Sequence, residues 1–136
     1  MKHHALIDAG PLIDLFDASS LTHAHYTELI RQDWILTTTW PCVVEACHFL
    51  EARASHALLQ WVVHGGVTVF PFEPLHLQDM IALMQQYTAW PRTEMDFADA
   101  TLVWLAAETN VTQVMTLDVR DFSRYRLPDG RGFEIL

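Results

Sequence analysis

Apolar and polar positions repeat along this chain with two different periods, which predicts strands alternating with helices. Short apolar runs typical of buried strands occupy residues 5–8, 34–39, 67–71, 114–118 and 133–136. Longer segments, with apolar positions three or four residues apart, are typical of helices and occupy residues 11–16, 21–32, 40–52, 55–65, 74–88 and 95–108. This alternation predicts an α/β fold with a mainly parallel sheet and helices on both of its faces.

The predicted helix at 95–108 combines two features that seldom occur together. Its apolar positions run almost all the way round, so we expect the helix to be buried. Its first turn nevertheless contains Asp96 and Asp99, and a spacing of three residues places both carboxylates on one helical face. Thr93 is the expected N-cap, with Asp96 in the first turn, where a carboxylate suits the helix dipole.

Acidic residues also close two of the predicted strands. Asp8 ends the first strand and Asp118 ends the fourth, while Glu45 lies among apolar positions near the start of the helix at 40–52. The carboxyl ends of parallel strands, and the helices that follow them, meet at one edge of a sheet. We therefore expect four acids to lie together at this edge: Asp8, Glu45, Asp99 and Asp118.

Carboxylates gathered in a buried position repel one another, and a low dielectric penalises each charge. A bound divalent cation is the simplest way to offset that cost, and without it the acids should raise one another's pKa values. Oxygen ligands without a cysteine or a paired histidine suit Mg²⁺ or Mn²⁺ better than Zn²⁺. One or two such ions favour hydrolysis of a phosphodiester bond.

Length and charge narrow the class of protein. We expect the 136 residues to form one domain, spanning 1–136, and a hydrophobic content of 51% is enough for a sizeable core. The net charge of −9 disfavours nucleic-acid binding by electrostatics alone. It suits a basic partner, or a carboxylate pocket whose charge a metal ion partly cancels.

The expected location is the cytoplasm. No run of about 18 apolar residues is present, so no membrane span is predicted, and the chain enters a strand-like run at once without a signal peptide. Cys42 and Cys47 lie five residues apart in a predicted helix and point to different sides, so we expect both thiols to be reduced.

The acids and their surrounding residues resemble those of PIN domains, and among these the VapC-type toxin ribonucleases of bacterial toxin–antitoxin pairs. Four segments carry the resemblance, one for each acid of the family: residues 6–12 with Asp8, the helix with Glu45, residues 95–100 with Asp99, and residues 116–122 with Asp118. The pattern covers nearly the whole chain, and the last two segments are its most specific parts.

The resemblance implies a PIN-like three-layer α/β/α fold with a twisted, mainly parallel five-stranded sheet. It also implies RNA cleavage that depends on Mg²⁺ or Mn²⁺, a homodimer, and a cognate antitoxin that occludes the acidic groove. The sequence departs from the family at Ala9, where the family often has a threonine or serine after the first aspartate. The hydroxyl that would orient a ligand there is missing, which predicts weaker metal binding.

Several site residues have two interpretations. Asp96 either joins Asp99 as a metal ligand or caps the helix, and Asp121 acts instead of Asp118 or beside it. Four of the eight Lys and Arg residues lie near the end of the chain: Arg120, Arg124, Arg126 and Arg131. The first three either contact RNA phosphates or balance nearby aspartates in a solvated loop and short helical turn.

Two functions remain open for this arrangement. The first is a metal-dependent endoribonuclease that acts as a toxin, with Asp8, Glu45, Asp99 and Asp118 as its catalytic acids. The second is a catalytically weak or inert PIN-fold module whose acidic groove captures a basic partner peptide. A phosphatase that forms an aspartyl-phosphate, which would need Asp-x-Asp at the first strand, is disfavoured by the sequence Asp8-Ala9-Gly10. A phospho-acceptor receiver is disfavoured because the only lysine is Lys2.

Overall fold

A five-stranded, entirely parallel sheet forms the centre of the computed structural model, which describes residues 3–136. Its order is β3-β2-β1-β4-β5, and its strands are β1 (His3–Ile7), β2 (Trp34–Thr38), β3 (Thr68–Val69), β4 (Gln113–Met115) and β5 (Glu134–Ile135). The predicted α/β fold with a five-stranded parallel sheet is confirmed. The edge strands β3 and β5 are shorter than the apolar runs that predicted them.

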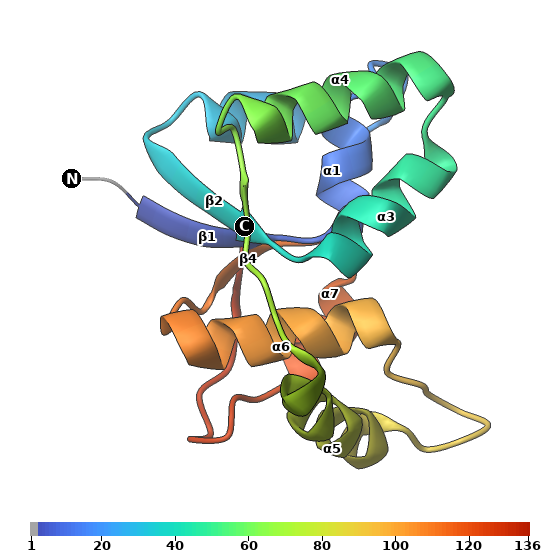
Figure 1. Cartoon of the computed structure of the whole chain (residues 1–136), viewed down its shortest axis with the longest axis vertical. Coiled ribbons are helices and arrows are strands. Elements are labelled where there is room, and N and C mark those ends of the chain that lie inside the picture. The colour runs from blue at the N-terminus through green and yellow to red at the C-terminus, as the bar shows by residue number, and fades with distance from the viewer. Residues whose placement is uncertain (1–2) are drawn as a thin grey trace.

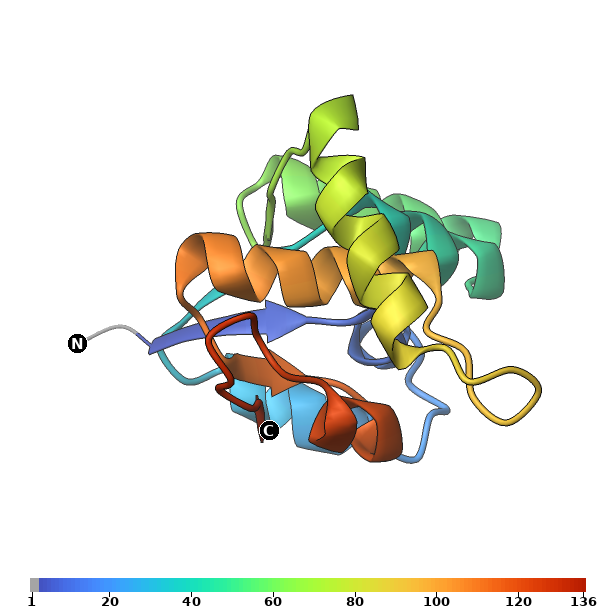
Figure 2. The ribbon, with the colours of Figure 1, turned by 90° about the horizontal axis from the view of Figure 1, so that it is seen from below.

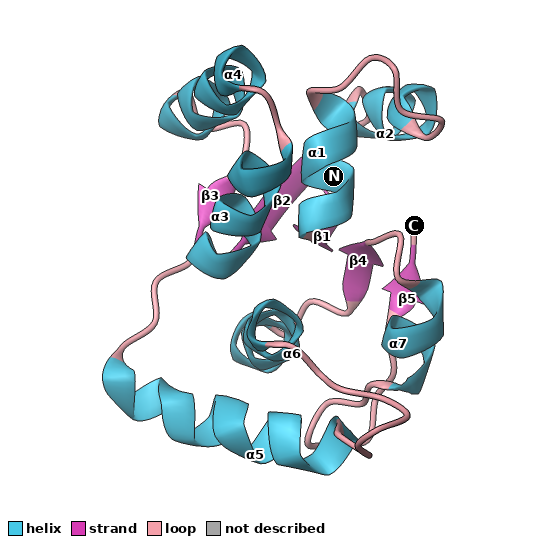
Figure 3. Cartoon of the chain, turned by 90° about the vertical axis from the view of Figure 1, so that its right-hand side faces the viewer, coloured by secondary structure: helices cyan, strands magenta, loops and turns pink. Residues whose placement is uncertain are grey.

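Helices cover both faces of the sheet and complete the three layers (Figure 1). They are α1 (Ala9–Leu15), α2 (His23–Ile30), α3 (Trp40–Phe49), α4 (Ala52–Val63), α5 (Leu77–Tyr87), α6 (Phe97–Thr109) and α7 (Val119–Arg124). Helices α1, α2 and α4 lie on one side, and α6 lies on the other, with α5 crossing its outer surface (Figures 2 and 3). None of the helices within residues 3–136 is long and apolar enough to span a membrane.

Three helices begin at aspartates, two of them at residues other than those expected. Asp8 caps α1, which therefore starts at Ala9, ahead of Pro11. Asp96 caps α6, so the prediction that Thr93 is the cap was wrong. Thr93 instead pairs with Ala89 in an isolated bridge within the preceding loop. The segment after β4, predicted to be a loop and a short helical turn, forms the six-residue helix α7 with Asp118 as its cap.

Strand order places a crevice between β1 and β4. From β1 the chain builds the sheet outward through β2 and β3, and β4 then returns to the other side of β1. In open α/β sheets, ligands bind where the connections of two neighbouring strands leave in opposite directions. The binding site lies just beyond the carboxyl ends of those two strands. The Asp8 N–H donates to the Met115 carbonyl at 3.0 Å, so Asp8 lies at this point.

Helix α6 is buried because it is enclosed by the sheet on one side and by α5 on the other (Figure 3). Leu102 and Leu105 are completely buried, and the remaining apolar positions from Ala98 to Ala106 are at least nine-tenths buried. This explains why the segment has no polar face. The packing of α6 also fixes its first turn, and with it Asp99, relative to the crevice.

We predict that Leu105→Ala lowers the free energy of unfolding by about 2–5 kcal/mol, because it removes buried methyl groups and leaves a cavity. Leu21→Ala is the matched control, since Leu21 is fully exposed, and should change stability by less than about 0.5 kcal/mol. Urea unfolding followed by circular dichroism measures both. Equal effects of the two substitutions would contradict the burial of α6.

Candidate metal centre

A cavity of about 200 Å³ lies at the carboxyl ends of β1 and β4. It is lined by Asp8, Ala9, Gly10, Glu45, Asp96, Asp99, Leu117 and Asp118. The four acids that chain order predicts to converge all line it, together with Asp96. Since the lining contains five carboxyl groups and no lysine or arginine, its negative charge is not balanced from within.

Asp8 is held at both of its carboxylate oxygens. The Ala9 N–H donates to Oδ1 at 2.8 Å, and the Thr116 hydroxyl donates to Oδ2 at 2.9 Å. The residue is only 8% exposed, and this burial raises its pKa; the charge of Asp96 adds to the rise, while the two donors oppose it. Thr116 thus supplies to the first acid a hydroxyl of the kind that Ala9 lacks.

Asp99 is a second strongly perturbed acid of the cavity. It is 7% exposed, and burial together with the charges of Asp8 and Asp96 raises its pKa to about 8. The buried Tyr125 hydroxyl donates to Oδ2 of Asp99 at 2.8 Å and opposes that rise. The Asp99 N–H donates to Oδ1 of Asp96 at 2.8 Å. Asp96 therefore caps the helix, as one of its two interpretations held, while also lining the cavity.

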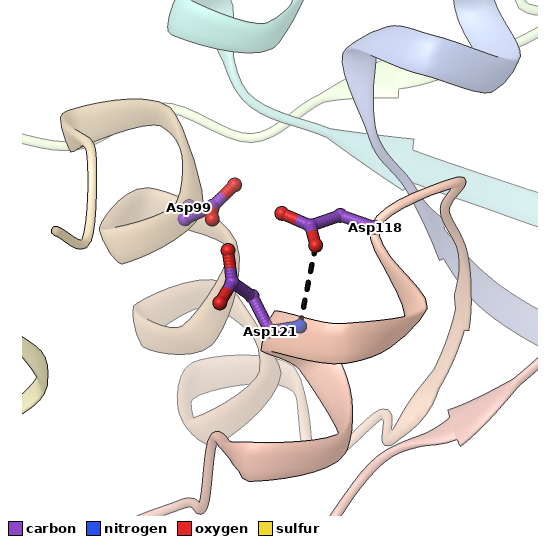
Figure 4. Close-up of side chains that lie close together, drawn as sticks. All are labelled: Asp99, Asp118 and Asp121. Atoms are coloured by element: carbon purple, nitrogen blue, oxygen red, sulfur yellow. Dashed lines mark hydrogen bonds between the residues drawn. The ribbon is translucent and has the colours of Figure 1, made fainter. Parts of the chain in front are cut away.

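Asp118 and Asp121 present two further carboxylates from α7 (Figure 4). Each of Asp99, Asp118 and Asp121 offers an oxygen within 4.8 Å of the others, a spacing at which one ion could be held. The Asp121 N–H donates to Oδ1 of Asp118 at 3.2 Å. Burial and the neighbouring Asp121 raise the pKa of Asp118. Partial burial would raise the pKa of Asp121, but its 2.9 Å ion pair with Arg124, its contact with Asp118 and the charge of Arg120 together lower it.

Glu45 reaches the cavity from α3, on the opposite side from α7. Its side chain is partly buried, and this burial, with the charges of Asp96 and Asp8, raises its pKa. Cys42, one turn earlier on the same helix, places its thiol 3.8 Å from Oδ1 of Asp8. The thiol is fully buried, and burial raises its pKa. The cysteine therefore contributes a neutral group beside Asp8.

The donor set fits a hard divalent cation. Asp8, Asp99, Asp118 and Asp121 offer oxygens only, and Glu45 and Asp96 complete the acidic wall. Burial and mutual repulsion raise the pKa values of four of these acids, and a bound cation would relieve both effects: Asp8, Glu45, Asp99 and Asp118. These residues are therefore suited to hold Mg²⁺ or Mn²⁺.

The arginines near the end of the chain differ in their partners. Arg124 pairs with Asp121, and Arg131 pairs with Asp129 at 2.8 Å. Arg126 donates to the backbone carbonyls of Ser123 and Tyr125. Among the ion pairs of residues 3–136, Arg120 has no carboxylate partner, and its charge contributes to the lowered pKa of Asp121. Arg120 is therefore the most available of the three predicted RNA contacts.

Two residues that touch the acids were not singled out by the sequence. Thr116 has a signal in retrospect, because it precedes Asp118 by two residues at the end of a strand and so shares its edge of the sheet. Tyr125 has a weaker signal, which requires knowing that the segment after Asp118 is a helix. Counted from Asp118, Asp121 is then three residues and Tyr125 seven residues further on, so all three lie on one helical face.

Comparison with known proteins identifies the fold. No protein-family model matches the sequence, and no curated protein sequence matches it. The crystal structure of VapC20 from Mycobacterium tuberculosis, a toxin that cleaves the sarcin–ricin loop, is similar with a TM-score of 0.71. The similarity covers 85% of this chain and 90% of VapC20, at 14% sequence identity. The chain therefore has the PIN fold of VapC-type proteins, as the resemblance implied.

We predict that the metal-free protein loses stability as the pH rises from about 4 to about 8. Asp99 has a pKa of about 8 in the folded chain, against 3.8 ordinarily, so the folded state holds a proton that the unfolded state has released. Asp99→Asn removes this ionisation and keeps an oxygen for Tyr125. The variant should exceed the wild type in stability by about 4–6 kcal/mol at pH 8 and match it near pH 4.

Urea unfolding in EDTA at pH 4, 6 and 8 measures this difference. Asp33→Asn serves as the control, because Asp33 is exposed before β2, at the opposite end of the sheet. Its difference from the wild type should stay constant across the pH range. A constant difference for Asp99→Asn as well would show that Asp99 ionises at an ordinary pH.

Proposed function

We propose that this chain is an endoribonuclease that depends on Mg²⁺ or Mn²⁺ and serves as the toxin of a type II toxin–antitoxin pair. The observation that carries the proposal is the convergence of Asp8, Glu45, Asp99 and Asp118 on one cavity without a balancing basic residue. The cavity lies at the ligand-binding edge of a fold shared with VapC20, itself a toxin that cleaves RNA. Phosphodiester hydrolysis is the reaction that such an oxygen-only site serves.

In this proposal Asp8, Asp99 and Asp118 hold the cation, with Asp121 at the margin of the site. When bound, the cation supplies Lewis-acid activation of the phosphodiester and of water. Glu45 faces these residues from α3, and its raised pKa suits it to accept a proton from the attacking water. The remaining donors, Thr116 and Tyr125, keep Asp8 and Asp99 in fixed orientations.

RNA is proposed as the substrate even though the chain carries a net charge of −9. Bound cations would offset much of the negative charge of the cavity, and Arg120, which has no ion-pair partner among residues 3–136, adds positive charge near Asp121. Arg124 and Arg126 are engaged with Asp121 and with backbone carbonyls, so their contribution to phosphate binding is secondary.

An apolar groove beside the cavity supports the proposed antitoxin partner. It encloses about 770 Å³, has Trp40, Val44, Phe49 and Phe97 as its exposed apolar side chains, and shares Glu45 and Asp96 with the cavity. A partner segment with apolar and basic residues would fill the groove and neutralise its acidic end. A homodimer located in the cytoplasm completes the proposal.

The same groove supports the second candidate function, a weak or inert binding module that captures a basic peptide. The two functions differ in whether the bound cation activates RNA for cleavage. They share the fold and the partner chemistry, so only a measurement of catalysis separates them.

We predict that purified, partner-free protein cleaves a mixed RNA pool in Mn²⁺ and that EDTA abolishes the cleavage. Asp99→Asn should reduce the rate by on the order of 10²–10³-fold, because it removes a charge from the centre of the site. Asp33→Asn, which changes an exposed acid far from the cavity, should cleave like the wild type.

Two outcomes of this assay would contradict the proposal in different ways. Cleavage by Asp99→Asn at the wild-type rate would remove Asp99 from the active site. Wild-type protein that binds Mn²⁺ in calorimetry, yet leaves every RNA in the pool intact, would favour the binding module.

We predict that Asp118 matters more for cleavage than Asp121. Asp118 lines the cavity, whereas the Asp121 carboxylate is already neutralised by Arg124. Asp118→Asn should reduce the rate by on the order of 10²–10³-fold, and Asp121→Asn by about tenfold. Rates measured at several Mn²⁺ concentrations test this order, and a larger loss in Asp121→Asn would assign the fourth acid to Asp121.

A further inference from the structure

Tyr125 contacts the cavity from a position that no acidic motif includes. Its side chain is completely buried, and its hydroxyl donates to Oδ2 of Asp99 at 2.8 Å. The residue caps the carboxyl end of α7, seven residues after Asp118, which caps the amino end. One short helix therefore delivers two carboxylates and one phenol toward Asp99.

The phenol ring is held in place by its neighbours. Its centroid lies 5.1 Å from those of Tyr87 and Phe122, in edge-on contacts, and 5.5 Å from the Arg124 guanidinium carbon. A buried phenol requires a hydrogen-bond acceptor. Among residues 3–136 its hydroxyl donates to Asp99 alone, so the ring and its hydrogen bond have one arrangement.

The two most buried acids of the cavity are held in different ways. Asp8 receives donors at both oxygens, from Ala9 and Thr116. Asp99 receives a side-chain donor at Oδ2, and within the described residues no protein donor reaches its Oδ1. The phenol thus fixes the plane of the Asp99 carboxylate and leaves the second oxygen available.

We infer that Tyr125 is a positioning residue for the metal site: its hydroxyl orients Asp99 so that Oδ1 is presented to the cation. This inference rests on the proposed metal-dependent function. Groups that hydrogen-bond to metal ligands orient them, and losing such a group typically weakens metal binding by about 10–100-fold. A phenol that only filled space would leave metal affinity unchanged when its oxygen is removed.

The test is Mn²⁺ titration calorimetry without RNA, on wild type, Tyr125→Phe and Tyr87→Phe. Tyr125→Phe keeps the packed ring and deletes the hydroxyl, so we expect Mn²⁺ affinity to fall by about 10–100-fold. Tyr87→Phe removes a phenol from the same aromatic cluster, but that hydroxyl bonds to the Arg126 backbone. Its Mn²⁺ affinity should remain within about twofold of wild type, since it does not contact a carboxylate of the site.

A double variant separates positioning from general destabilisation. In Asp99→Asn the carboxylate is absent, so adding Tyr125→Phe should not weaken Mn²⁺ binding further if the phenol acts through Asp99. The double variant also leaves no buried Asp99 charge unpaired, so it remains informative if Tyr125→Phe alone does not fold.

Each result has a distinct meaning. Wild-type protein that binds no Mn²⁺ would contradict the proposed function itself. Wild-type binding that Tyr125→Phe leaves unchanged would overturn the positioning role while the metal site stands. A further loss of affinity on adding Tyr125→Phe to Asp99→Asn would also overturn it, because the phenol would then act by another route.

Discussion

Burying several carboxylates beside one another is the constraint on which the rest of this structure depends. The fold meets it with hydrogen-bond donors at the four aspartates of the cavity, and three of these donors are backbone N–H groups at helix starts. Asp8 caps α1, Asp96 caps α6 and Asp118 caps α7, and each accepts from an N–H of the helix that it begins. Helix amino ends also carry partial positive charge, which favours carboxylates there. These three aspartates are therefore stabilised by the first turns of the helices that they cap.

Parallel strand order brings these helix starts together. Because all five strands run in one direction, every helix that follows a strand begins at the same edge of the sheet. The reversal of strand order at β1 and β4 places the cavity between Asp8, at the start of α1, and Asp118, at the start of α7. The buried helix α6 contributes Asp99 from the opposite layer. Sheet topology thus determines which acids meet, and local hydrogen bonds determine how they are oriented.

This division explains what the sequence could predict. Apolar periodicity and chain order were sufficient for the parallel α/β fold and for the expectation that Asp8, Glu45, Asp99 and Asp118 share one edge. Hydrogen-bond partners distant in sequence were not predictable in this way. Thr116 meets Asp8 across 108 residues, and Tyr125 meets Asp99 across 26. Such pairs depend on side-chain packing, which periodicity does not describe.

The expected cap of α6 shows a different reason for failure. Thr93 and Asp96 both had residue types suited to a helix start, and Thr93 lies three residues before Asp96. The loop bridge between Ala89 and Thr93 engages Thr93 in another turn, so Asp96 becomes the cap. Local propensity allowed both positions, and the path of the chain into α6 selected one.

Ala9 shows why a missing family residue need not remove its chemistry. The first acid lacks a hydroxyl neighbour in sequence, yet its Oδ2 accepts from Thr116 of the adjacent strand. Thr116 also accepts the Asp118 N–H at 3.0 Å, so one hydroxyl connects the first and fourth acids across the crevice. The orientation of Asp8 is therefore coupled to the start of α7, which also carries the phenol that orients Asp99. The side chains that orient the two most buried carboxylates of the cavity therefore lie close to the two ends of α7: Thr116 shortly before it and Tyr125 at its C-cap.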